Sequence, residues 1–450
     1  SKTTIEGTMI ALENDTGYIT SLVGGSKFDS ENQFIRAVQA KLQPGSAFKP
    51  LYYSAAIDSR NFTPTSIISD TPVVFHTADG KPYIPQNFRG EWKGDVELWY
   101  ALAHSMNVPS LKVLDGIGFE AGINRSIALL GIPKEEVPYR GFVPGYPIGL
   151  GVCSVRPIEL ARAYSVFASG GKEVTPIAIR SVEDKNGNVI LNPEKEVRTA
   201  LQAKGAAAQV ISPQTAFVMT ELLQNTVRSG TLAGPSSNGN KLRYRDSNGR
   251  PYKIPAAGKT GTTSNDIDLW FEGFTPYYTA GIWGGWDLNK NQADTTYHKT
   301  IWKTIMEQVH SFKQLEKTDF EVPESAKQTY ICTSCGKLAT DACKAAGAVK
   351  KEIFTDNNAP TEYCTCHSQK KNNTTAETTD STNSTDSSTS DTKKSDNTSQ
   401  KVTNKSEKTP SDVEAKVNKT DKASDEETKV DDNSDSESYD VEASVNTAEE

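Results

Sequence analysis

The chain has 450 residues, of which 36% are hydrophobic and 24% charged, and its formal net charge is −8. The acidity is confined to one end. Residues 368–450 contain 11 Lys, no Arg and 20 Asp or Glu, a net charge of −9, whereas residues 1–367 contain 38 basic and 37 acidic side chains. Because this first part is nearly neutral, nucleic acid is not expected as a partner. No run approaches the roughly 18 apolar residues of a membrane helix, so we expect a soluble segment whose membrane anchor, if any, lies upstream.

The acidic tail at residues 368–450 is rich in Ser, Thr, Asn and Asp and contains one aromatic residue, one Pro, no Gly and no Cys. Such a segment cannot bury enough apolar surface to offset the entropy of ordering, so we expect it to be disordered. A hydrophilic spacer is the favoured role, and a binding segment for cationic partners is the alternative. The rest divides into a main domain at 1–325 and a Cys-rich segment at 326–367.

The main domain opens with two β-branched apolar runs around Asn14–Gly17, which predict a β-hairpin. A helix is predicted to start near Ser46, where Pro50 is tolerated within the first turn. From Asp95 to about Arg162 the pattern is mainly helical. These elements predict strands followed by a helical lobe.

Strand signals return at 176–193 with a hairpin turn at 185–188, and a helix follows at 213–230. After an expected Gly-, Ser- and Asn-rich loop at 234–250, three strands and a final helix are predicted, over 254–262, 268–276, 277–286 and 297–312. This order predicts an α+β domain: an antiparallel β-sheet built from both ends of the chain and flanked by helices, plus an all-helical lobe.

Three short patterns carry the candidate chemistry, namely Ser46-Ala47-Phe48-Lys49, Ser105-Met106-Asn107 and Lys259-Thr260-Gly261-Thr262. Ser46 and Lys49 are one helical turn apart, so the hydroxyl and the amine share a face near a helix N-terminus. A neutral, desolvated Lys can take the Ser proton. The first pattern therefore suits a serine nucleophile activated by a lysine.

Each pattern alone has an ordinary explanation. Ser46 could be an N-cap and Lys49 an exposed cation on a helix. Ser105 and Asn107 could form a polar turn, and Lys259 could belong to an edge strand. The Ser-x-x-Lys spacing recurs at Ser334, Ser368 and Ser390. Only the three patterns together, in this order and each in its predicted helix, turn or strand, would rarely occur by chance.

Together with stretches such as "KTGTTSNDIDLWFEGFTPYYTAGIWGGWD", these motifs resemble the transpeptidase domain of class A, high-molecular-weight penicillin-binding proteins over roughly residues 5–320. The resemblance implies the serine penicillin-recognising fold that β-lactamases share. It also implies a D,D-transpeptidase that acts on peptidoglycan stem peptides ending in D-Ala-D-Ala, is acylated by β-lactam antibiotics and needs no cofactor or metal.

The resemblance also implies a role for each motif residue. Ser46 is the expected nucleophile and Lys49 its base, while Ser105, tuned by Lys259, relays a proton to the leaving amine. Asn107 is expected to hold the substrate amide. The terminal carboxylate would bind at Lys259, Thr260, Gly261 and Thr262, and the backbone N–H groups of Ser46 and Thr262 would form the oxyanion hole.

Other consequences concern the whole protein. The resemblance implies an upstream glycosyltransferase domain, contacts with cell-wall synthesis proteins, and a location on the extracytoplasmic face of the bacterial membrane with an N-terminal anchor outside this chain. A D,D-carboxypeptidase or a serine β-lactamase is the alternative on the same fold, with Asp266 or Asp268 as candidate deacylation bases. A non-catalytic muropeptide or β-lactam receptor is the alternative of another class.

Five of the six cysteines lie in the Cys-rich segment, and an extracellular location favours disulfides among them, with pairing among Cys332, Cys343 and Cys364. The alternative is a zinc site with Cys332, Cys335, Cys364 and Cys366 as ligands and His367 as an optional further one. Cys153 is expected to be a buried small apolar residue.

Overall fold

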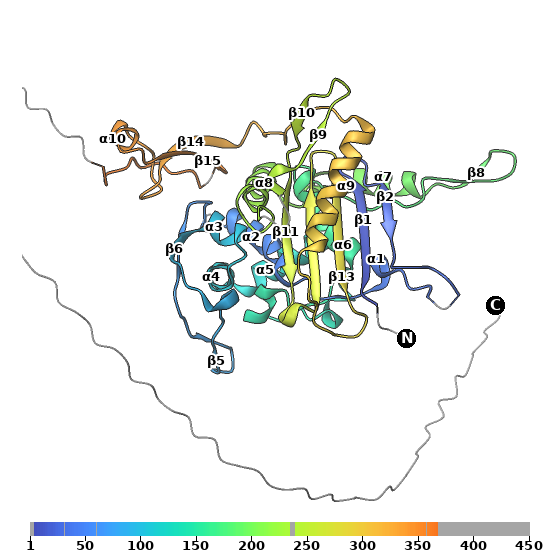
Figure 1. Ribbon diagram of the computed structural model, residues 1–450, viewed down its shortest axis with the longest axis horizontal. Coiled ribbons are helices and arrows are strands. Elements are labelled where there is room, and N and C mark those ends of the chain that lie inside the picture. The colour runs from blue at the N-terminus through green and yellow to red at the C-terminus, as the bar shows by residue number, and fades with distance from the viewer. Residues whose placement is uncertain (1–3, 31, 60, 235–238, 357, 368–450) are drawn as a thin grey trace, which may run out of the picture. The chain divides into compact units, whose positions relative to one another are not determined.

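The main domain is built on a five-stranded antiparallel sheet. In the computed structural model the strands lie in the order β11-β12-β13-β1-β2. Their bounds are, in the same order, Ala257–Thr262, Asp268–Phe274, Tyr278–Gly285, Glu6–Glu13 and Ile19–Val23. Strand β1 pairs with β13 from Glu6 opposite Gly285 to Glu13 opposite Tyr278 (Figure 1). The prediction of an antiparallel sheet that joins both ends of the domain is therefore confirmed.

Helices cover both faces of this sheet. Helix α9 (Tyr297–Lys313) crosses one face, while α6 (Pro157–Ala168) and α8 (Pro213–Arg228) pack on the other (Figure 1). The indole Nε1 of Trp302 in α9 donates a hydrogen bond to the carbonyl O of Ala280, 3.0 Å away, and its ring lies edge-on to Phe271 with centroids 5.0 Å apart. These contacts bury the apolar stripe of α9, as its periodicity predicts.

The helical lobe adds α2 (Lys49–Asp58), α3 (Leu98–Ala103), α4 (Asn107–Ile117) and α5 (Phe119–Leu130) to α6 and α8. They share one hydrophobic core with the inner face of the sheet. The prediction of a mainly helical stretch is confirmed for α3 to α6, but residues 131–156 form only short 3-10 turns. Pro and Gly recur throughout that stretch, and neither sustains an α-helix.

The domain also carries small two-stranded antiparallel sheets. Three of them are hairpins, namely β4 (Phe75–His76) with β5 (Pro82–Tyr83), β7 (Val182–Glu183) with β8 (Val189–Leu191), and β9 (Arg243–Arg245) with β10 (Pro251–Lys253). The fourth pairs β3 (Ile67–Asp70) with β6 (Gly94–Glu97), with β4 and β5 between them in the chain. The turn expected at 185–188 joins β7 and β8. The prediction of a loop throughout 234–250 is wrong at β9, where Tyr244 is buried and pairs opposite Tyr252. Cross-strand aromatic packing outweighs the surrounding turn-forming residues there.

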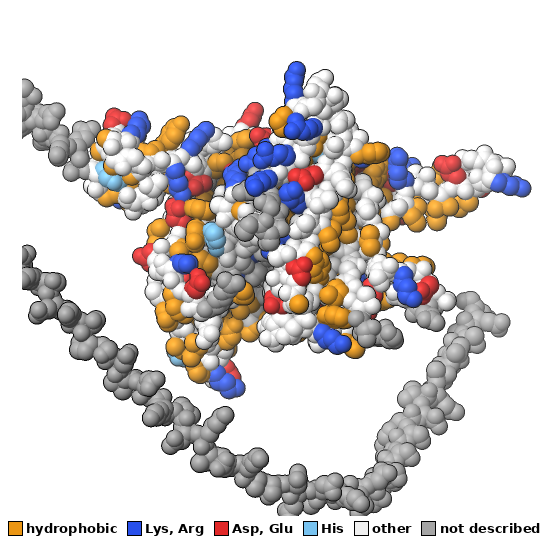
Figure 2. Space-filling model, viewed as in Figure 1, with side chains coloured by type: hydrophobic (Ala, Val, Ile, Leu, Met, Phe, Trp, Pro, Cys, Tyr) orange, Lys and Arg blue, Asp and Glu red, His pale blue; other side chains and the backbone are white. Residues whose placement is uncertain are grey.

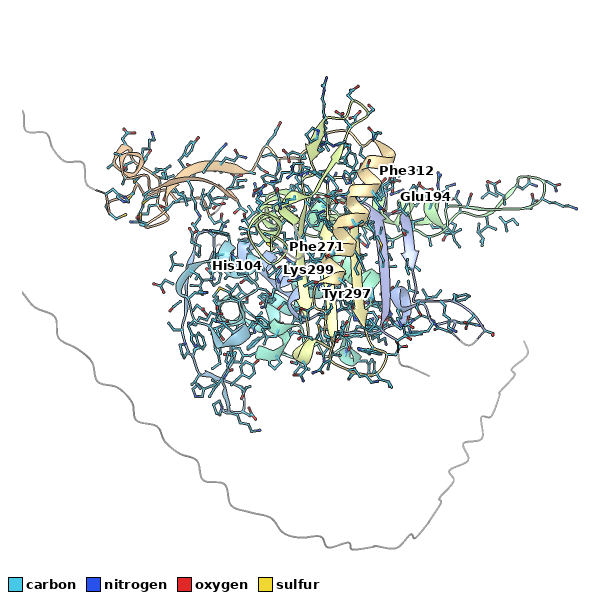
Figure 3. The ribbon with its side chains drawn as sticks, in the orientation of Figure 1. His104, Glu194, Phe271, Tyr297, Lys299 and Phe312 are labelled. Atoms are coloured by element: carbon cyan, nitrogen blue, oxygen red, sulfur yellow. The ribbon has the colours of Figure 1, made fainter. Side chains whose placement is uncertain are left out.

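Helix α7 (Pro193–Lys204) was not predicted because none of its residues is buried. Its start nevertheless carries a signal, since the Asn192 side chain caps the Lys195 N–H at 2.9 Å and Pro193 follows at the first helical position. Glu194 ties α7 to the domain through hydrogen bonds with the Tyr18 hydroxyl and the Arg180 guanidinium (Figure 3).

The remaining elements are the short helix α1 (Arg36–Gln39) and the 3-10 turns η1 (Gly45–Phe48), η2 (Phe88–Gly90), η3 (Val137–Tyr139), η4 (Tyr146–Leu150), η5 (Gly205–Ala208), η6 (Gly239–Lys241) and η7 (Ser264–Asp266). On the surface, Lys and Arg side chains gather over β9, β10 and the end of α8 (Figure 2). The exposed residues concerned are Arg228, Lys241, Arg243, Arg245, Arg250 and Lys253.

The Cys-rich segment contains β14 (Lys327–Cys332), α10 (Asp341–Ala345) and β15 (Val349–Phe354), with β14 antiparallel to β15. The expectation of disulfides is wrong for this structure, in which all six cysteines are free. The Cys364 sulfur lies 3.0 Å from that of Cys366, well beyond the roughly 2.05 Å of a disulfide bond. Cys153 is buried in the core of the helical lobe, as expected.

The structure describes residues 4–30, 32–59, 61–234, 239–356 and 358–367. By its contacts the chain divides into Ser1–Asn372 and Asn373–Glu450. The tail at 368–450, for which we expect disorder, lies outside the described residues. Among the helices that are described, none has both the length and the apolar character required to cross a membrane.

Candidate functional site

Ser46 lies in η1, a single 3-10 turn that runs directly into α2. Gly45 has a φ of +53°, and a Cβ at this position would lie 2.5 Å from the carbonyl O of Thr262. Glycine therefore allows this turn to approach the end of β11 closely. The Ser46 side chain is half-buried, and its hydroxyl forms no hydrogen bond with the described residues.

Two buried side chains hold this turn in place. The Tyr164 hydroxyl of α6 donates to the carbonyl O of Ala47 at 2.8 Å, and the Trp270 indole of β12 donates to the carbonyl O of Gln43 at 2.9 Å. Both rings are fully buried. The segment that carries Ser46 is thus fixed from the helical side and from the sheet.

Lys49 is fully buried, so the ordinary explanation of an exposed helix cation is wrong. Its Nζ lies 2.9 Å from the carbonyl O of Ser105, 3.1 Å from that of Met106 and 2.8 Å from Oδ1 of Asn107. A neutral amine can donate to two of these three acceptors. Burial and, secondarily, the charge of Lys259 hold the pKa of the Lys49 amine well below its usual value. An amine in this state can accept a proton.

Ser105 and Asn107 flank the link between α3 and α4. Ser105 has a φ of +58°, a left-handed conformation that non-glycine residues rarely adopt and that often accompanies functional sites. Its hydroxyl accepts a hydrogen bond from Lys259 Nζ at 2.8 Å. Asn107 is the first residue of α4, and its Nδ2 donates to the carbonyl O of Gln86 at 2.9 Å.

Lys259 lies in β11 at the edge of the sheet and is fully buried. Besides Ser105, its Nζ contacts the carbonyl O of Thr260 at 3.0 Å. Burial lowers the pKa of Lys259 to about 7. The hydroxyl of Thr260 lies 2.9 Å from that of Thr231, so it is engaged away from the two lysines.

Gly261 and Thr262 complete β11. A Cβ on Gly261 would lie 2.3 Å from the carbonyl O of Pro44 and 3.0 Å from the Cβ of Ala47, so glycine allows the segment around η1 to lie against β11. Thr262 is exposed at the end of the strand. Strand β11 therefore offers a buried amine at one position and an accessible hydroxyl three residues later.

The structure thus brings all three motifs together. Lys49, Ser105, Asn107 and Lys259 form one hydrogen-bonded cluster, although Lys259 is 154 residues from Ser105 in sequence. Ser46, Gly261 and Thr262 adjoin it through the close approach of η1 to β11. The reading of these motifs as unrelated turns and strands is therefore wrong.

Of the two acidic candidates, Asp268 is already engaged. Its carboxylate accepts hydrogen bonds from the Trp283 indole at 2.9 Å and from the Thr263 hydroxyl at 3.0 Å. Burial raises the pKa of Asp268. Asp266 lies in η7 with a φ of +53°, and its backbone N–H donates to the carbonyl O of Thr263 at 3.1 Å.

The sequence did not single out Asn87. Its Oδ1 accepts the backbone N–H groups of Asn107 at 3.0 Å and Val108 at 3.1 Å, and so caps the start of α4. Its Nδ2 donates to the buried Asp70 carboxylate at 2.6 Å. Because this cap comes from a residue 20 positions before the helix, no local pattern reveals it.

Within the described residues, the groups of His, Cys, Asp and Glu that are close enough to share a metal ion lie in the Cys-rich segment, outside this cluster. The site therefore has amines and hydroxyls as its chemical groups. A buried low-pKa amine beside a serine suits proton transfer to and from a hydroxyl nucleophile.

Comparison with known proteins agrees with this arrangement. The family model "Penicillin binding protein transpeptidase domain" matches residues 7–307. A second model, "Penicillin-binding protein 1A, C-terminal domain", matches residues 322–369. The two matches together span the described part of the chain from the first strand to the Cys-rich segment.

Among curated relatives, Penicillin-binding protein 1A of Pseudomonas aeruginosa is 32% identical over 66% of this chain and 38% of its own length. That of Aquifex aeolicus is 32% identical over 76% of this chain and 43% of its own length. This chain therefore spans less than half of these relatives.

Among solved structures, Penicillin-Binding Protein 1A from Haemophilus influenzae has a TM-score of 0.65 at 24% identity, covering 80% of this chain and 54% of its own. The PonA1 protein from Mycobacterium tuberculosis, in complex with penicillin V, has a TM-score of 0.53 at 22% identity, covering 71% and 81%. These likenesses establish the fold. With the family model matching residues 7–307 and the three motifs assembled in space, this chain belongs to the penicillin-binding protein transpeptidase family.

Proposed function

We propose that this domain is a D,D-transpeptidase that cross-links peptidoglycan stem peptides through an acyl-enzyme on Ser46 and is acylated there by β-lactams. The observation that carries the proposal is the pair of fully buried lysines. Lys49 bonds the side chain of Asn107, and Lys259 bonds the hydroxyl of Ser105. Two desolvated amines that both bond Ser105, one of them three residues after Ser46, provide proton transfer without histidine.

In the acylation step, Lys49 takes the proton of the Ser46 hydroxyl as Oγ attacks the carbonyl carbon of the penultimate D-Ala. The C–N bond of the substrate amide breaks, and the terminal D-Ala leaves as an amine that receives its proton from Ser105. Ser105 is reprotonated by the proton that Lys49 took from Ser46, so Lys49 returns to its neutral state. Lys259 supports this relay through its 2.8 Å hydrogen bond. Oxyanion stabilisation is assigned to the N–H groups of Ser46 and Thr262, and removal of one such donor typically costs about 10²–10³ in rate.

Substrate binding is assigned to the edge of β11. The terminal carboxylate would lie near Lys259 and the exposed Thr262, with Thr260 able to join after its hydroxyl leaves Thr231. Gly261 allows the strand and substrate to approach closely. The Asn107 amide, whose Nδ2 now donates to Gln86, would hold the substrate amide.

Deacylation decides among the functions available to this fold. In transpeptidation, the amine of a neighbouring stem peptide attacks the ester carbonyl, forms a new amide and frees Ser46. Hydrolysis by a carboxypeptidase or a β-lactamase requires an activated water. Both oxygens of the Asp268 carboxylate already accept hydrogen bonds, from Trp283 and Thr263, so neither is free to activate a water, which supports transpeptidation. A non-catalytic receptor has no need of two buried amines.

The remaining proposals concern the whole protein and rest on the resemblance and on relatives more than twice as long as the matched region. We propose an upstream glycosyltransferase domain, an N-terminal anchor and a location on the extracytoplasmic face of the bacterial membrane. The division at 1–325, 326–367 and 368–450 also remains a proposal, which the family matches at 7–307 and 322–369 support.

The test is intact-protein mass spectrometry after incubation with benzylpenicillin, with peptide mapping of the adduct. A persistent one-to-one adduct on Ser46 is expected, and Ser46→Ala removes it. Ser334→Ala is a matched control, because Ser334 and Lys337 have the same spacing in an exposed turn of the Cys-rich segment. Rapid turnover of the antibiotic would indicate a β-lactamase, and an adduct that survives Ser46→Ala would refute the nucleophile.

Transpeptidation itself is measured with a D-Ala-D-Ala peptide and an added amine acceptor. The expected product is the new amide, formed with release of one D-Ala per turnover. Release of D-Ala without amide formation at high acceptor concentration would identify a carboxypeptidase instead.

A further inference from the structure

The Cys-rich segment has a core built largely from sulfur. Cys332, Cys343 and Cys364 form one buried cluster, with Ala339 and Val349 packed against it, and the segment also buries Ile331 and Phe354. A segment of this size buries too little apolar surface to hold its own fold, and such units usually rely on disulfides or a metal ion. The cysteines form no disulfide in this structure, which leaves a metal ion as the candidate cross-link.

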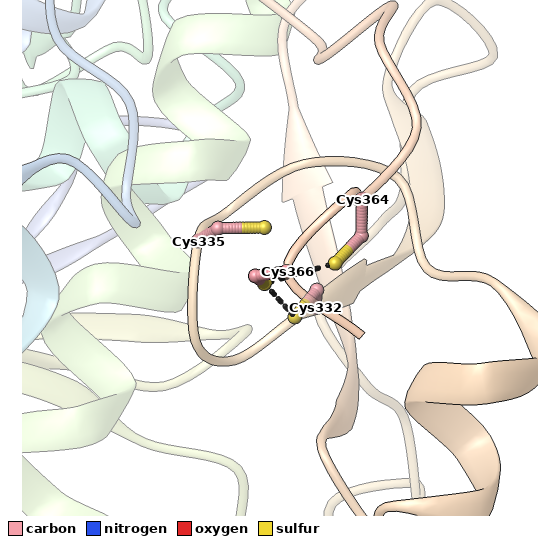
Figure 4. A group of neighbouring side chains, drawn as sticks. All are labelled: Cys332, Cys335, Cys364 and Cys366. Atoms are coloured by element: carbon pink, nitrogen blue, oxygen red, sulfur yellow. Dashed lines mark hydrogen bonds between the residues drawn. The ribbon is translucent and has the colours of Figure 1, made fainter. Parts of the chain in front are cut away.

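Four sulfur atoms converge in this segment, from Cys332, Cys335, Cys364 and Cys366 (Figure 4). All four lie within 4.8 Å of one another. The sulfur of Cys366 is 3.8 Å from that of Cys332 and 3.0 Å from that of Cys364. Tetrahedral zinc with Zn–S bonds of about 2.3 Å separates its ligands by about 3.8 Å. The observed spacing is close to what one ion needs and too wide for disulfide bonds.

A backbone turn positions the first pair of sulfurs, those of Cys332 and Cys335. After β14 the chain turns at Cys332–Cys335: the Gly336 N–H donates to the carbonyl O of Cys332 at 2.8 Å, and Gly336 has a φ of +68°. The Ser334 N–H donates to the Cys332 sulfur at 3.4 Å. Amide dipoles directed at sulfur favour the thiolate, which is the form that binds metal.

A backbone hydrogen bond positions the second pair of sulfurs, those of Cys364 and Cys366. The Cys364 N–H donates to the carbonyl O of Leu338 at 2.8 Å. Two alternative ligands lie nearby. The Nδ1 of His367 is 3.4 Å from the Cys332 sulfur, whereas Cys343 is fully buried and lies 3.2 Å from the Thr340 hydroxyl. The four-sulfur set draws its ligands in pairs from two short stretches, Cys332–Cys335 and Cys364–Cys366. Unlike a set that includes Cys343, it leaves the contact between Cys343 and Thr340 intact.

We propose that Cys332, Cys335, Cys364 and Cys366 bind one Zn²⁺ in a closed structural site. Binding converts four thiols to thiolates and releases up to four protons, with no change in oxidation state. The site cross-links the end of β14 to the end of the segment. It lies outside the proposed catalytic cluster, so its loading is expected to stabilise the segment without creating the acylation activity.

The segment is attached to the main domain by polar contacts. Lys350 of β15 forms an ion pair with Glu97 at 2.8 Å, and the Asn358 amide donates to the carbonyl O of Ile57 at 3.4 Å and of Phe62 at 3.2 Å. Loss of the metal is therefore expected to loosen the segment first, while the main domain keeps its own core.

The test uses the full chain purified under reducing conditions, with metal content measured by plasma mass spectrometry. About one zinc per chain is expected, together with lower thermal stability after removal by a strong chelator. Cys335→Ser and Cys366→Ser are expected to lose the zinc, while Cys343→Ser keeps it. Acylation by benzylpenicillin, retained in these variants, shows that the main domain is folded and separates this proposal from the proposed function.

Cobalt substitution gives a second readout that does not depend on stability. Thiolate-to-cobalt charge-transfer bands and tetrahedral d–d bands are expected for the wild type and are lost in Cys335→Ser. The proposal is overturned by zinc-free protein whose peptide map contains disulfides, by iron in place of zinc, or by loss of zinc in Cys343→Ser and His367→Ala with retention in Cys335→Ser and Cys366→Ser.

Discussion

Lys259 Nζ lies 2.8 Å from Ser105 Oγ, although the two residues are 154 positions apart. Lys259 belongs to β11, the edge strand of the sheet, whereas Ser105 belongs to the segment between α3 and α4 in the helical lobe. This hydrogen bond therefore forms only when the helical lobe packs against the sheet as it does here. It also joins a buried amine of lowered pKa to a hydroxyl with strained backbone, which is the pairing expected of a proton relay.

The two lysines predict a bell-shaped pH dependence of acylation. Lys49 must be neutral to accept the Ser46 proton, so the rate rises with pH through its lowered pKa. Lys259 must be charged to attract a carboxylate and to support Ser105, so the rate falls as pH passes about 7. Stopped-flow acylation with a chromogenic cephalosporin measures both limbs.

Lys259→Arg tests the assignment of the falling limb. A guanidinium stays protonated throughout the range, so the fall near pH 7 is expected to disappear even if the maximum rate is lower. Circular dichroism at each pH checks that folding is constant. A falling limb that persists in Lys259→Arg would contradict the role given to Lys259.

Asn87→Ala is predicted to slow acylation indirectly, because Asn87 positions the start of α4 and is not assigned a substrate contact. It removes the acceptor for the N–H groups of Asn107 and Val108, and loss of such a cap costs about 0.5–2 kcal/mol of stability. Displacement of Asn107 lowers the acylation rate by up to about 10²-fold, the cost of a 1 Å misplacement. The expected signature is a lower limiting rate with unchanged antibiotic affinity. Asn61→Ala, at an exposed position, is the control.

Gly45→Ala is predicted to separate η1 from β11. A Cβ at this residue would lie 2.5 Å from the Thr262 carbonyl O, and the φ of +53° adds strain. Gly80→Ala is a matched control, because Gly80 has a φ of +76° but no atom within 4 Å of its Cβ position. Both variants lose about 1–2 kcal/mol to the left-handed backbone. Only Gly45→Ala is expected to lose acylation, and equal activity in the two would contradict the close-approach argument.

The main strands and helices were predictable because their signals are local. The continuous apolar and aromatic runs of β12 and β13 and the apolar periodicity of α8 and α9 each lie within one segment. The three motifs were likewise readable, since their order is a property of the sequence. Local pattern failed where tertiary contacts decide: the strand at β9 depends on Tyr244 packing, and the cap on α4 comes from Asn87, 20 residues away.

The burial of Lys49 likewise depends on tertiary contacts that no local pattern shows. As one cation in a helix it reads as exposed, and only the fold reveals that it is buried against Ser105 and Asn107. The cysteines illustrate a different limit. Their spacing permits both disulfides and a metal site, and the choice depends on sulfur positions set by the turn at Cys332–Cys335.

The buried Glu272 gives a prediction about stability. This residue of β12 is fully buried, and neither carboxyl oxygen has a hydrogen-bond partner among the described residues. A Cβ on the facing Gly281 would lie 2.3 Å from Oε1, so the carboxyl occupies space that glycine leaves free. Burial raises the pKa of Glu272 well above its usual value. The folded protein thus holds a proton that the unfolded chain releases above about pH 4.3.

The sign of the pH effect follows from that proton. Because the native state binds more protons than the unfolded state above about pH 4.3, Glu272 makes the free energy of unfolding fall as pH rises, by up to about 1.4 kcal/mol per pH unit. Glu272→Gln removes this dependence, so the variant is expected to gain stability over the wild type between pH 5 and 8, as measured by urea unfolding. Glu135→Gln, which removes an exposed carboxyl, is the control. Parallel unfolding curves for Glu272→Gln and wild type across this range would mean that Glu272 is ionised in the folded protein.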